Sequence, residues 1–311
     1  MAKASTLAVG SWELKASPEL TFRLGPYEYD LQAKDGDVVF SVSDGTQSTT
    51  KDLKWAVGDG LYGQTYVYRE QGKYYESELS FYRRLNGLDM TTGHMEPKSL
   101  ETAAGDLTTP AMIRQCFGCH FTAATTKDHF DPDGATPGVT CEACHGPGAR
   151  HVQAESSAGA EDADPKQLIM NPAKLDAVDL VDFCGACHRN PADAVLTGVA
   201  HKGIVDVRLQ PYRLEKSRCW GKGDARLTCI ACHDPHVQVI SDAGFYDQKC
   251  LRCHAAGSNA RLAAPGSAPA CKVATKNCVT CHMPKVEVAG AHATFTDHDI
   301  RIVRSGTPYP D

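Results

Sequence analysis

The pattern Cys-x-x-Cys-His occurs six times in this chain of 311 residues. In each copy two thiols lie three positions apart, and an imidazole follows the second thiol directly. This is the attachment pattern of c-type haem, in which two Cys bind the vinyl groups of one porphyrin and the His binds its iron. The sequence therefore predicts six covalently attached haem c groups. The predicted attachment residues are Cys116, Cys119, Cys141, Cys144, Cys184, Cys187, Cys229, Cys232, Cys250, Cys253, Cys278 and Cys281, and the predicted proximal iron ligands are His120, His145, His188, His233, His254 and His282.

Zinc ribbons and disulfides are the other common uses of Cys-x-x-Cys pairs. A zinc ribbon has no need of a His directly after the second Cys. His makes up 13 of the 311 residues, so chance would place one there about 4% of the time, and in six of six copies on the order of once in 10⁸. The recurrence of the His therefore favours haem.

Seven His lie outside the six motifs, close to the number of distal ligands that six six-coordinate irons require. An iron with two axial His changes oxidation state without offering a position to a substrate. The count therefore favours electron transfer over catalysis, and no catalytic residue is predicted. His94 is expected not to bind iron. The predicted distal ligands are His129, His151, His201, His236, His292 and His298.

Residues 1–105 contain no Cys and a single His. Apolar and polar residues alternate in 20–24, 38–42 and 64–68, and Gly-containing turn signals separate these segments. We therefore predict an N-terminal, haem-free, all-β domain over 1–105, built as an antiparallel sandwich or barrel.

Residues 106–311 contain all six motifs, with roughly 28 residues of chain per haem, too few to enclose each porphyrin in a core of its own. We predict a mostly helical and irregular multihaem cytochrome c domain whose core is made of stacked haems. Short helices are expected to hold many of the motifs, and also to cover 175–183 and 192–196.

Charge and hydropathy limit the possible partners. The formal charge is −6, which disfavours nucleic acid as a partner. No apolar run approaches the 18 residues of a membrane span. We expect redox partner proteins or a terminal electron acceptor, and self-association is an open alternative.

Haem c is attached outside the cytoplasm, so the protein is expected to be exported to the periplasm or beyond. No leader is visible in MAKASTLAVG, and its prior removal is the expected reason. Two Cys lie outside the motifs, Cys219 and Cys271. A disulfide between them and two separate buried thiols are both open.

Several segments resemble a family of bacterial multihaem cytochromes c, of the type found in Acidobacteria, with doubled Cys-x-x-Cys-His motifs. They include GVTCEACHGPGARHV (138–152), LTCIACHDPHVQV (227–239) and NCVTCHMPKVEV (277–288). Similar elements occur more distantly in the group of cytochrome c nitrite reductase and octahaem hydroxylamine oxidoreductase. The resemblance implies distal roles for His151, His236 and His298, and by weaker matches for His129, His201 and His292. The Cys-x-x-Cys-Lys motif of the nitrite reductases is absent from the sequence, and no counterpart of the cross-linked Tyr of the hydroxylamine enzymes is located.

The leading hypothesis is a multihaem c-type cytochrome that carries electrons through six closely packed, mostly bis-His haems. One alternative is an enzyme that reduces a small nitrogen or sulfur oxyanion, or peroxide, at one open haem. The other is a subunit of an extracellular cytochrome filament.

Overall fold

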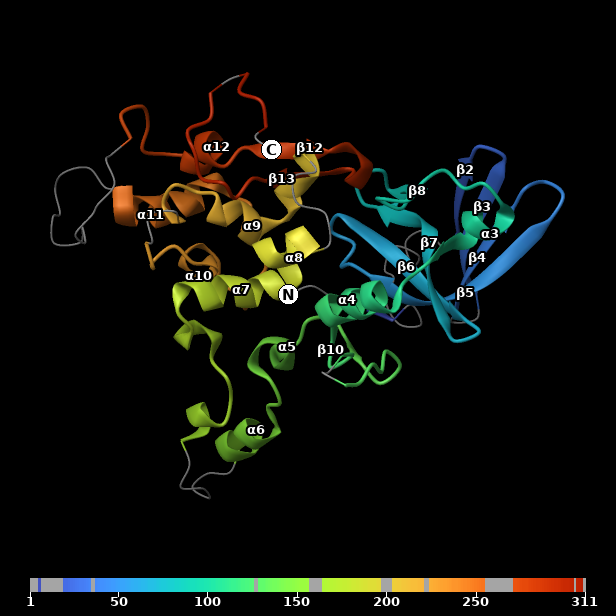
Figure 1. Ribbon diagram of the computed structural model, residues 1–311, viewed down its shortest axis with the longest axis horizontal. Coiled ribbons are helices and arrows are strands. Elements are labelled where there is room, and N and C mark those ends of the chain that lie inside the picture. Colours follow the sequence, from blue (N-terminus) through green and yellow to red (C-terminus); the bar gives the residue numbers. More distant parts are fainter. Residues whose placement is uncertain are drawn as a thin grey trace. The chain divides into compact units, whose positions relative to one another are not determined.

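The computed structural model describes residues 5–6, 19–34, 37–125, 128–156, 164–196, 203–220, 224–254, 271–304 and 306–309. The chain divides into two compact units, whose helices and strands are labelled in Figure 1. Unit 1 comprises Met1–Met170 and Ala289–Ala293, and unit 2 comprises Asn171–Val288 and Thr294–Asp311. The sequence predicts a different division, between a haem-free segment 1–105 and a haem-bearing segment 106–311. That boundary stays a prediction.

Unit 1 is built on one antiparallel sheet whose strands mostly follow one another in a meander. Two short strands, β1 and β9, add to its path by pairing with β5 and β7. The strands are β1 Ser5–Thr6, β2 Glu19–Leu24, β3 Tyr27–Lys34, β4 Asp37–Ser43, β5 Ser48–Val57, β6 Gly63–Glu70, β7 Lys73–Tyr82, β8 Gly87–Met90 and β9 Gly105–Leu107.

The sheet is a half-barrel, so the predicted N-terminal antiparallel β domain, a sandwich or barrel, is confirmed in part. Its terminal strands β2 and β8 come into contact, but among the described residues no hydrogen-bonded ladder joins them. The concave side is filled by the short helix α3 (Leu100–Ala104), which packs against β4, β5 and β7. Because Ala103 and Ala104 are fully buried in the main core, a helix takes the place that a second sheet would have filled.

The period-two alternation of the sequence produces this core. Residues of one parity face α3, as the alternating geometry of a strand requires. The core cluster consists of Leu20, Tyr27, Tyr29, Leu31, Val38, Phe40, Val42, Leu53, Ala56, Tyr66, Tyr68, Leu79, Phe81, Leu88, Ala103 and Ala104.

A second apolar cluster joins the sheet to α4 (Pro110–His120), the helix that contains the first Cys-x-x-Cys-His copy. The register of β5 against β6 shifts between Leu53 and Trp55. Leu53 belongs to the main core and Trp55 to this second cluster. The indole meets Phe117 edge-on at 5.3 Å between ring centroids. The sheet thus positions the first motif.

Short helices dominate the rest of the chain. Unit 1 also contains α5 Cys141–His145, α6 Ala149–Ser156 and the two-stranded β10 Phe121–Thr122 with β11 Thr136–Pro137. Unit 2 contains α7 Ala177–His188, α8 Pro191–Leu196, α9 Gln210–Glu215, α10 Cys229–Cys232, α11 Ala243–His254, α12 Cys278–His282 and the strand β12 Lys285–Val288, and its partner β13 is Ala293–Thr296. Helices were expected at 175–183 and 192–196, and α7 and α8 lie there. No helix of the described segments is long and apolar enough to span a membrane.

A buried ion pair organises unit 2. Arg213 of α9 donates two hydrogen bonds to Asp297, from Nε to Oδ1 and from Nη2 to Oδ2, each at 2.9 Å. Both side chains are fully buried, and the guanidinium also lies over the ring of Tyr309 at 4.6 Å. The pair fixes the segment that follows β13 against α9.

Candidate haem attachment sites

Every Cys-x-x-Cys-His copy lies on a helix and stands at its C-terminal end. In a helix, positions i, i+3 and i+4 share one face, so in the five copies whose His is helical both thiols and the imidazole share one face of the helix. Five of the helices, α4, α5, α7, α11 and α12, end at the His itself, whereas α10 ends at Cys232 and His233 is its C-cap residue.

Local sequence explains where these helices begin. Thr109 caps α4 by accepting a hydrogen bond from the backbone N–H of Met112, and Pro110 follows at the first helical position. Asp176 caps α7 in the same way. Side-chain caps therefore account for the starts of α4 and α7, whereas α5, α10 and α12 begin without a side-chain cap bond.

The fifth and sixth motifs are joined by a carboxylate. Asp247, on α11, accepts hydrogen bonds from the backbone N–H groups of Asn277 and Cys278, both at 2.8 Å. These bonds to the start of α12 lower the pKa of Asp247. Cys250 and Cys278 also hydrogen-bond to each other. The two motifs are therefore held side by side.

The third and fourth motifs are also neighbours. The thiols of Cys184 on α7 and Cys229 on α10 hydrogen-bond to each other, which raises the pKa of Cys229 and lowers that of Cys184. Helix α10 also contacts α11. Motifs three to six thus form a contiguous group within unit 2.

Five predicted iron ligands share one hydrogen-bond arrangement. A backbone carbonyl only accepts, so an imidazole nitrogen bonded to it must carry the proton, and the lone pair is then on the other ring nitrogen. Metal-binding His are typically fixed in this way. The Nδ1 partners are the carbonyls of Met170 for His145 (2.7 Å), Arg301 for His282 (2.9 Å), Pro165 for His151 (3.0 Å) and Thr296 for His298 (3.0 Å), and the carboxylate of Asp234 for His236 (3.2 Å).

His233 and His298 lie close together in unit 2. Their ring centroids are 6.2 Å apart and their planes differ by 36°. Two imidazoles that each place a nitrogen about 2 Å from one shared metal ion have ring centres about 6 Å apart. The proximal His of the fourth motif and a predicted distal His therefore stand at the separation that one iron between them requires.

These imidazoles are neutral. Burial lowers the pKa of His298 to about 4. Burial also lowers the pKa of His233 and of His188, which lies near enough to interact electrostatically with both. Neutral imidazole is the form that binds a metal ion, so the donor set fits haem iron.

The other three predicted distal ligands are placed differently. His129 is exposed, with its Nε2 3.9 Å from a carboxylate oxygen of Asp131. His292 has its Nε2 2.7 Å from Asp89 and stands edge-on to the ring of Tyr82. His201 lies outside the described residues. His94, expected not to bind iron, is buried among carboxylates of the sheet.

The structure contains residues at these sites that the sequence did not reveal. Asp247 and Arg213 had no motif around them, although each organises a ligand-bearing segment. The carbonyls that fix the imidazoles are main-chain atoms, so no side-chain pattern could indicate them. Cys219 is half-buried and Cys271 exposed, and neither forms a disulfide in the structure.

Comparisons with known proteins give a coarse assignment. The family model described as cytochrome c554 and c-prime matches residues 80–146, which contain the first two motifs. The multiheme cytochrome MtrA of Shewanella baltica (strain OS185) is 26% identical over 204 residues, 61% of this chain and 49% of the relative. The chain thus spans about half the length of that relative. No solved structure matches. With the six motifs, these similarities support the assignment of the chain to the multihaem c-type cytochromes, which bind haem c covalently.

Proposed function

We propose that this chain binds six haem c groups, one at each Cys-x-x-Cys-His copy, and that it carries electrons from a redox partner to an acceptor through them. Haem supplies a reversible one-electron iron centre at each site. The chain's own residues attach the porphyrins, ligate the irons and fix the imidazoles.

The observation that carries the proposal is the pair His233 and His298. One is a motif His and the other lies 65 positions further along the chain, yet their rings stand 6.2 Å apart. Both are neutral because of burial. Such a pair suits an iron with two His ligands, which transfers electrons with little rearrangement. We assign His298 as the distal ligand of the haem attached at Cys229 and Cys232.

The packing of unit 2 supports haem as its main apolar filling. Among its described residues, the one buried apolar cluster consists of Ala194, Leu209 and Tyr212, and a few other apolar side chains are buried outside it: Leu180, Val181, Val207, Leu214 and Val288. Many large apolar side chains are instead exposed: Val178, Val195, Leu196, Ile204, Val205, Ile230, Val237, Val239, Ile240, Phe245, Val273 and Ile302. Porphyrin faces would bury such side chains, as the prediction of a haem core requires.

The remaining ligands are proposals of the same kind. His151 and His236 have the Nδ1 bond that leaves the lone pair on Nε2. His129 and His201 stay proposed from the count of His alone, whereas the bond between His292 Nε2 and Asp89 argues against the predicted distal role of His292. Export to the periplasm or beyond, and redox partner proteins, follow from haem c attachment outside the cytoplasm.

One observation favours a second candidate, an enzyme that reduces a small oxyanion or peroxide at one open haem. His292 is bonded to Asp89 through Nε2, and His94 is held by Glu76 and Glu78. Setting these two aside leaves five His outside the motifs for six irons. One iron would then lack a distal His and could accept a small ligand.

Intact-protein mass spectrometry of the denatured holoprotein tests the haem count, because thioether bonds survive denaturation. We expect the polypeptide mass plus six haems. A smaller number, or zinc instead of haem, would contradict the proposal. Electron paramagnetic resonance of the oxidised protein separates the two candidates: low-spin signals alone support the carrier, and a high-spin signal that changes when nitrite is added supports the enzyme.

A further inference from the structure

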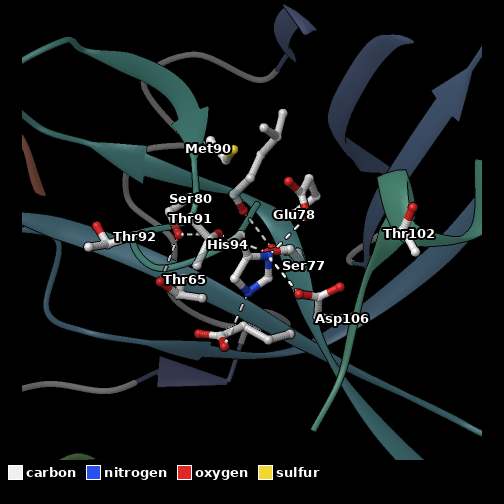
Figure 2. A network of polar contacts seen from close by, with 12 residues as sticks. Thr65, Ser77, Glu78, Ser80, Met90, Thr91, Thr92, His94, Thr102 and Asp106 are labelled. Carbon is white, nitrogen blue, oxygen red and sulfur yellow. Dashed lines mark hydrogen bonds and ion pairs between the residues drawn. The ribbon is translucent and has the colours of Figure 1, made fainter. Parts of the chain in front are cut away.

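A second group of potential metal ligands lies in the β-sheet of unit 1, away from every Cys-x-x-Cys-His motif in the sequence. Glu78 on β7, His94 in the turn after β8, and Asp106 on β9 each offer one ligand atom, and these atoms lie within 4.8 Å of one another. Figure 2 shows the imidazole of His94 between Glu78 and Asp106. We propose that Glu78, His94 and Asp106 bind a divalent transition-metal cation, with Zn²⁺ as the best match.

The separations between the ligand atoms suit such a cation. Nδ1 of His94 is 3.0 Å from a carboxylate oxygen of Glu78 and 3.8 Å from one of Asp106. Two ligands that each stand about 2 Å from a tetrahedral Zn²⁺ are roughly 3.3 Å apart. The two distances bracket that value, so small side-chain rotations would complete the site.

The far side of the imidazole is already arranged as in a metal site. Nε2 of His94 lies 3.4 Å from a carboxylate oxygen of Glu76. A ligating His usually donates its other N–H to a carboxylate or carbonyl, which fixes the ring and the tautomer. Glu76 would accept that N–H, which leaves the lone pair of Nδ1 directed at the cation.

A buried carboxylate oxygen of Glu78 without a hydrogen-bond partner independently supports a bound cation. The side chain of Glu78 is 1% exposed, and its Oε1 is buried without a hydrogen-bond partner. A buried, unsatisfied carboxylate oxygen is costly. The ion-pair contacts of this group in the described residues join His94 to Glu76, Glu78 and Asp106, so in these contacts one imidazole faces three carboxylates. A divalent cation would offset this excess of negative charge.

The backbone builds the site from neighbouring segments of the sheet. Asp106 stands opposite Glu76 in the β7–β9 register. Gly105 permits this close approach, since its φ is +152° and a Cβ there would lie 2.3 Å from the carbonyl oxygen of Glu76. The His94 turn closes with a hydrogen bond from its N–H to the carbonyl of Thr91. Asp106 is 54% exposed, which provides a route for the cation.

The test uses the intact holoprotein, stripped with a chelator and titrated with Zn²⁺ alone. Bound zinc is counted by elemental mass spectrometry, and the affinity for Zn²⁺ is measured by isothermal titration calorimetry. We expect about one zinc per chain, with at least a tenfold weaker affinity in the Asp106→Asn variant. Asp133→Asn is the matched control, because Asp133 is 56% exposed and lies outside the group; its affinity should equal that of the parent.

X-ray absorption at the zinc edge reads the ligands without interference from haem iron. We expect one imidazole and at least two oxygens at about 2.0–2.2 Å, with no sulfur. Asp106→Asn changes an exposed residue and should leave the circular dichroism spectrum unaltered, so loss of zinc cannot be attributed to unfolding. If the parent binds no zinc, or if Asp106→Asn binds it as tightly as Asp133→Asn, the proposal is wrong.

Discussion

At the scale of single residues, the position of the imidazole proton separates five of the described His into two kinds. His145, His151, His282 and His298 donate from Nδ1 to a carbonyl, whereas Nε2 of His292 meets a carboxylate. In the first arrangement Nε2 keeps its lone pair and can bind a metal ion, whereas in the second Nε2 is already hydrogen-bonded to a carboxylate. Ligand roles should therefore differ between His298 and His292, although sequence alone predicts the same role for both.

Replacement of His298 by Ala tests this difference. The haem attached at Cys229 and Cys232 should remain bound through its thioethers, but its iron should lose one axial ligand and become high-spin. Electron paramagnetic resonance should show a new high-spin signal from one of six irons, and carbon monoxide should bind there. His292→Ala is the comparison and should leave the spin states unchanged. A new high-spin signal in His292→Ala, or none in His298→Ala, would contradict the assignment.

His94 should make the stability of unit 1 depend on pH. Burial on its own lowers the pKa of His94, but hydrogen bonds and charges from Glu76 and Glu78 outweigh it and raise the pKa to about 9. The protonated ring is therefore favoured by folding. Its contribution is fully present below the ordinary pKa of about 6.5 and is lost as the pH rises to about 9.

Urea unfolding of the chelator-treated protein, followed by circular dichroism, checks this dependence. The free energy of unfolding should fall between pH 6.5 and 9 by up to about 3 kcal/mol more in the parent than in His94→Gln, whose amide does not titrate. Equal slopes in the two proteins would show that the ring is not charged in the fold.

The motif residues themselves were predictable, because the five positions of Cys-x-x-Cys-His contain both attachment thiols and the proximal iron ligand. The proton arrangement of the imidazoles was not, because it depends on carbonyls such as those of Met170 and Arg301, 25 and 19 positions from the His they fix. The expectation that His94 stands apart from the iron ligands rested on its place in the sequence. The carboxylates around it come from strands whose register no local pattern reveals.

At the scale of elements, the buried pair Arg213–Asp297 decides how α9 holds the segment that presents His298. A fully buried ion pair adds little net stability over an apolar pair, but removal of one partner leaves a buried charge uncompensated. Asp297 also accepts a hydrogen bond from Arg301, so several groups depend on this carboxylate.

A second carboxylate, that of Asp299, lies 3.5 Å from Nη2 of Arg213. Asp297→Asn should therefore destabilise unit 2 by up to about 3–5 kcal/mol and disturb the iron that His298 is proposed to ligate. The exposed pair between Arg226 and Asp224, at 2.6 Å, is the control, and Asp224→Asn should cost less than about 1 kcal/mol. Urea midpoints compare the two variants. Similar losses in both would show that burial does not set the importance of the Arg213 pair.

The sequence predicted the types of the secondary-structure elements better than it predicted how they pack together. Alternation in segments such as 20–24 and 38–42 predicted the strands of the sheet, because one face of each strand is buried. It could not distinguish a half-barrel from a sandwich or a closed barrel. That outcome depends on α3, a five-residue helix whose Ala103 and Ala104 fit against the concave face.

At the scale of the whole molecule, the two units differ in what the protein provides as a core. The sheet of unit 1 has a large apolar cluster of its own. The described part of unit 2 has a cluster of three buried residues and a few separately buried ones such as Val181 and Val207, together with exposed side chains such as Leu196 at 86% and Val239 at 72%. Burial of apolar surface is the main stabilising contribution in folding, so unit 2 should depend on its haems and the sheet should not.

Proteolysis of the haem-free chain, expressed without haem attachment, tests this dependence. The sheet, residues 19–107, should resist cleavage in both the haem-free and the holo forms, because its core needs no cofactor. Segments 171–196 and 224–254 should be cleaved rapidly in the haem-free chain and protected in the holoprotein, since porphyrin supplies the surface against which their apolar side chains pack. Equal protection of these segments in the two forms would mean that the polypeptide alone completes the core of unit 2, and that stacked haems do not form it.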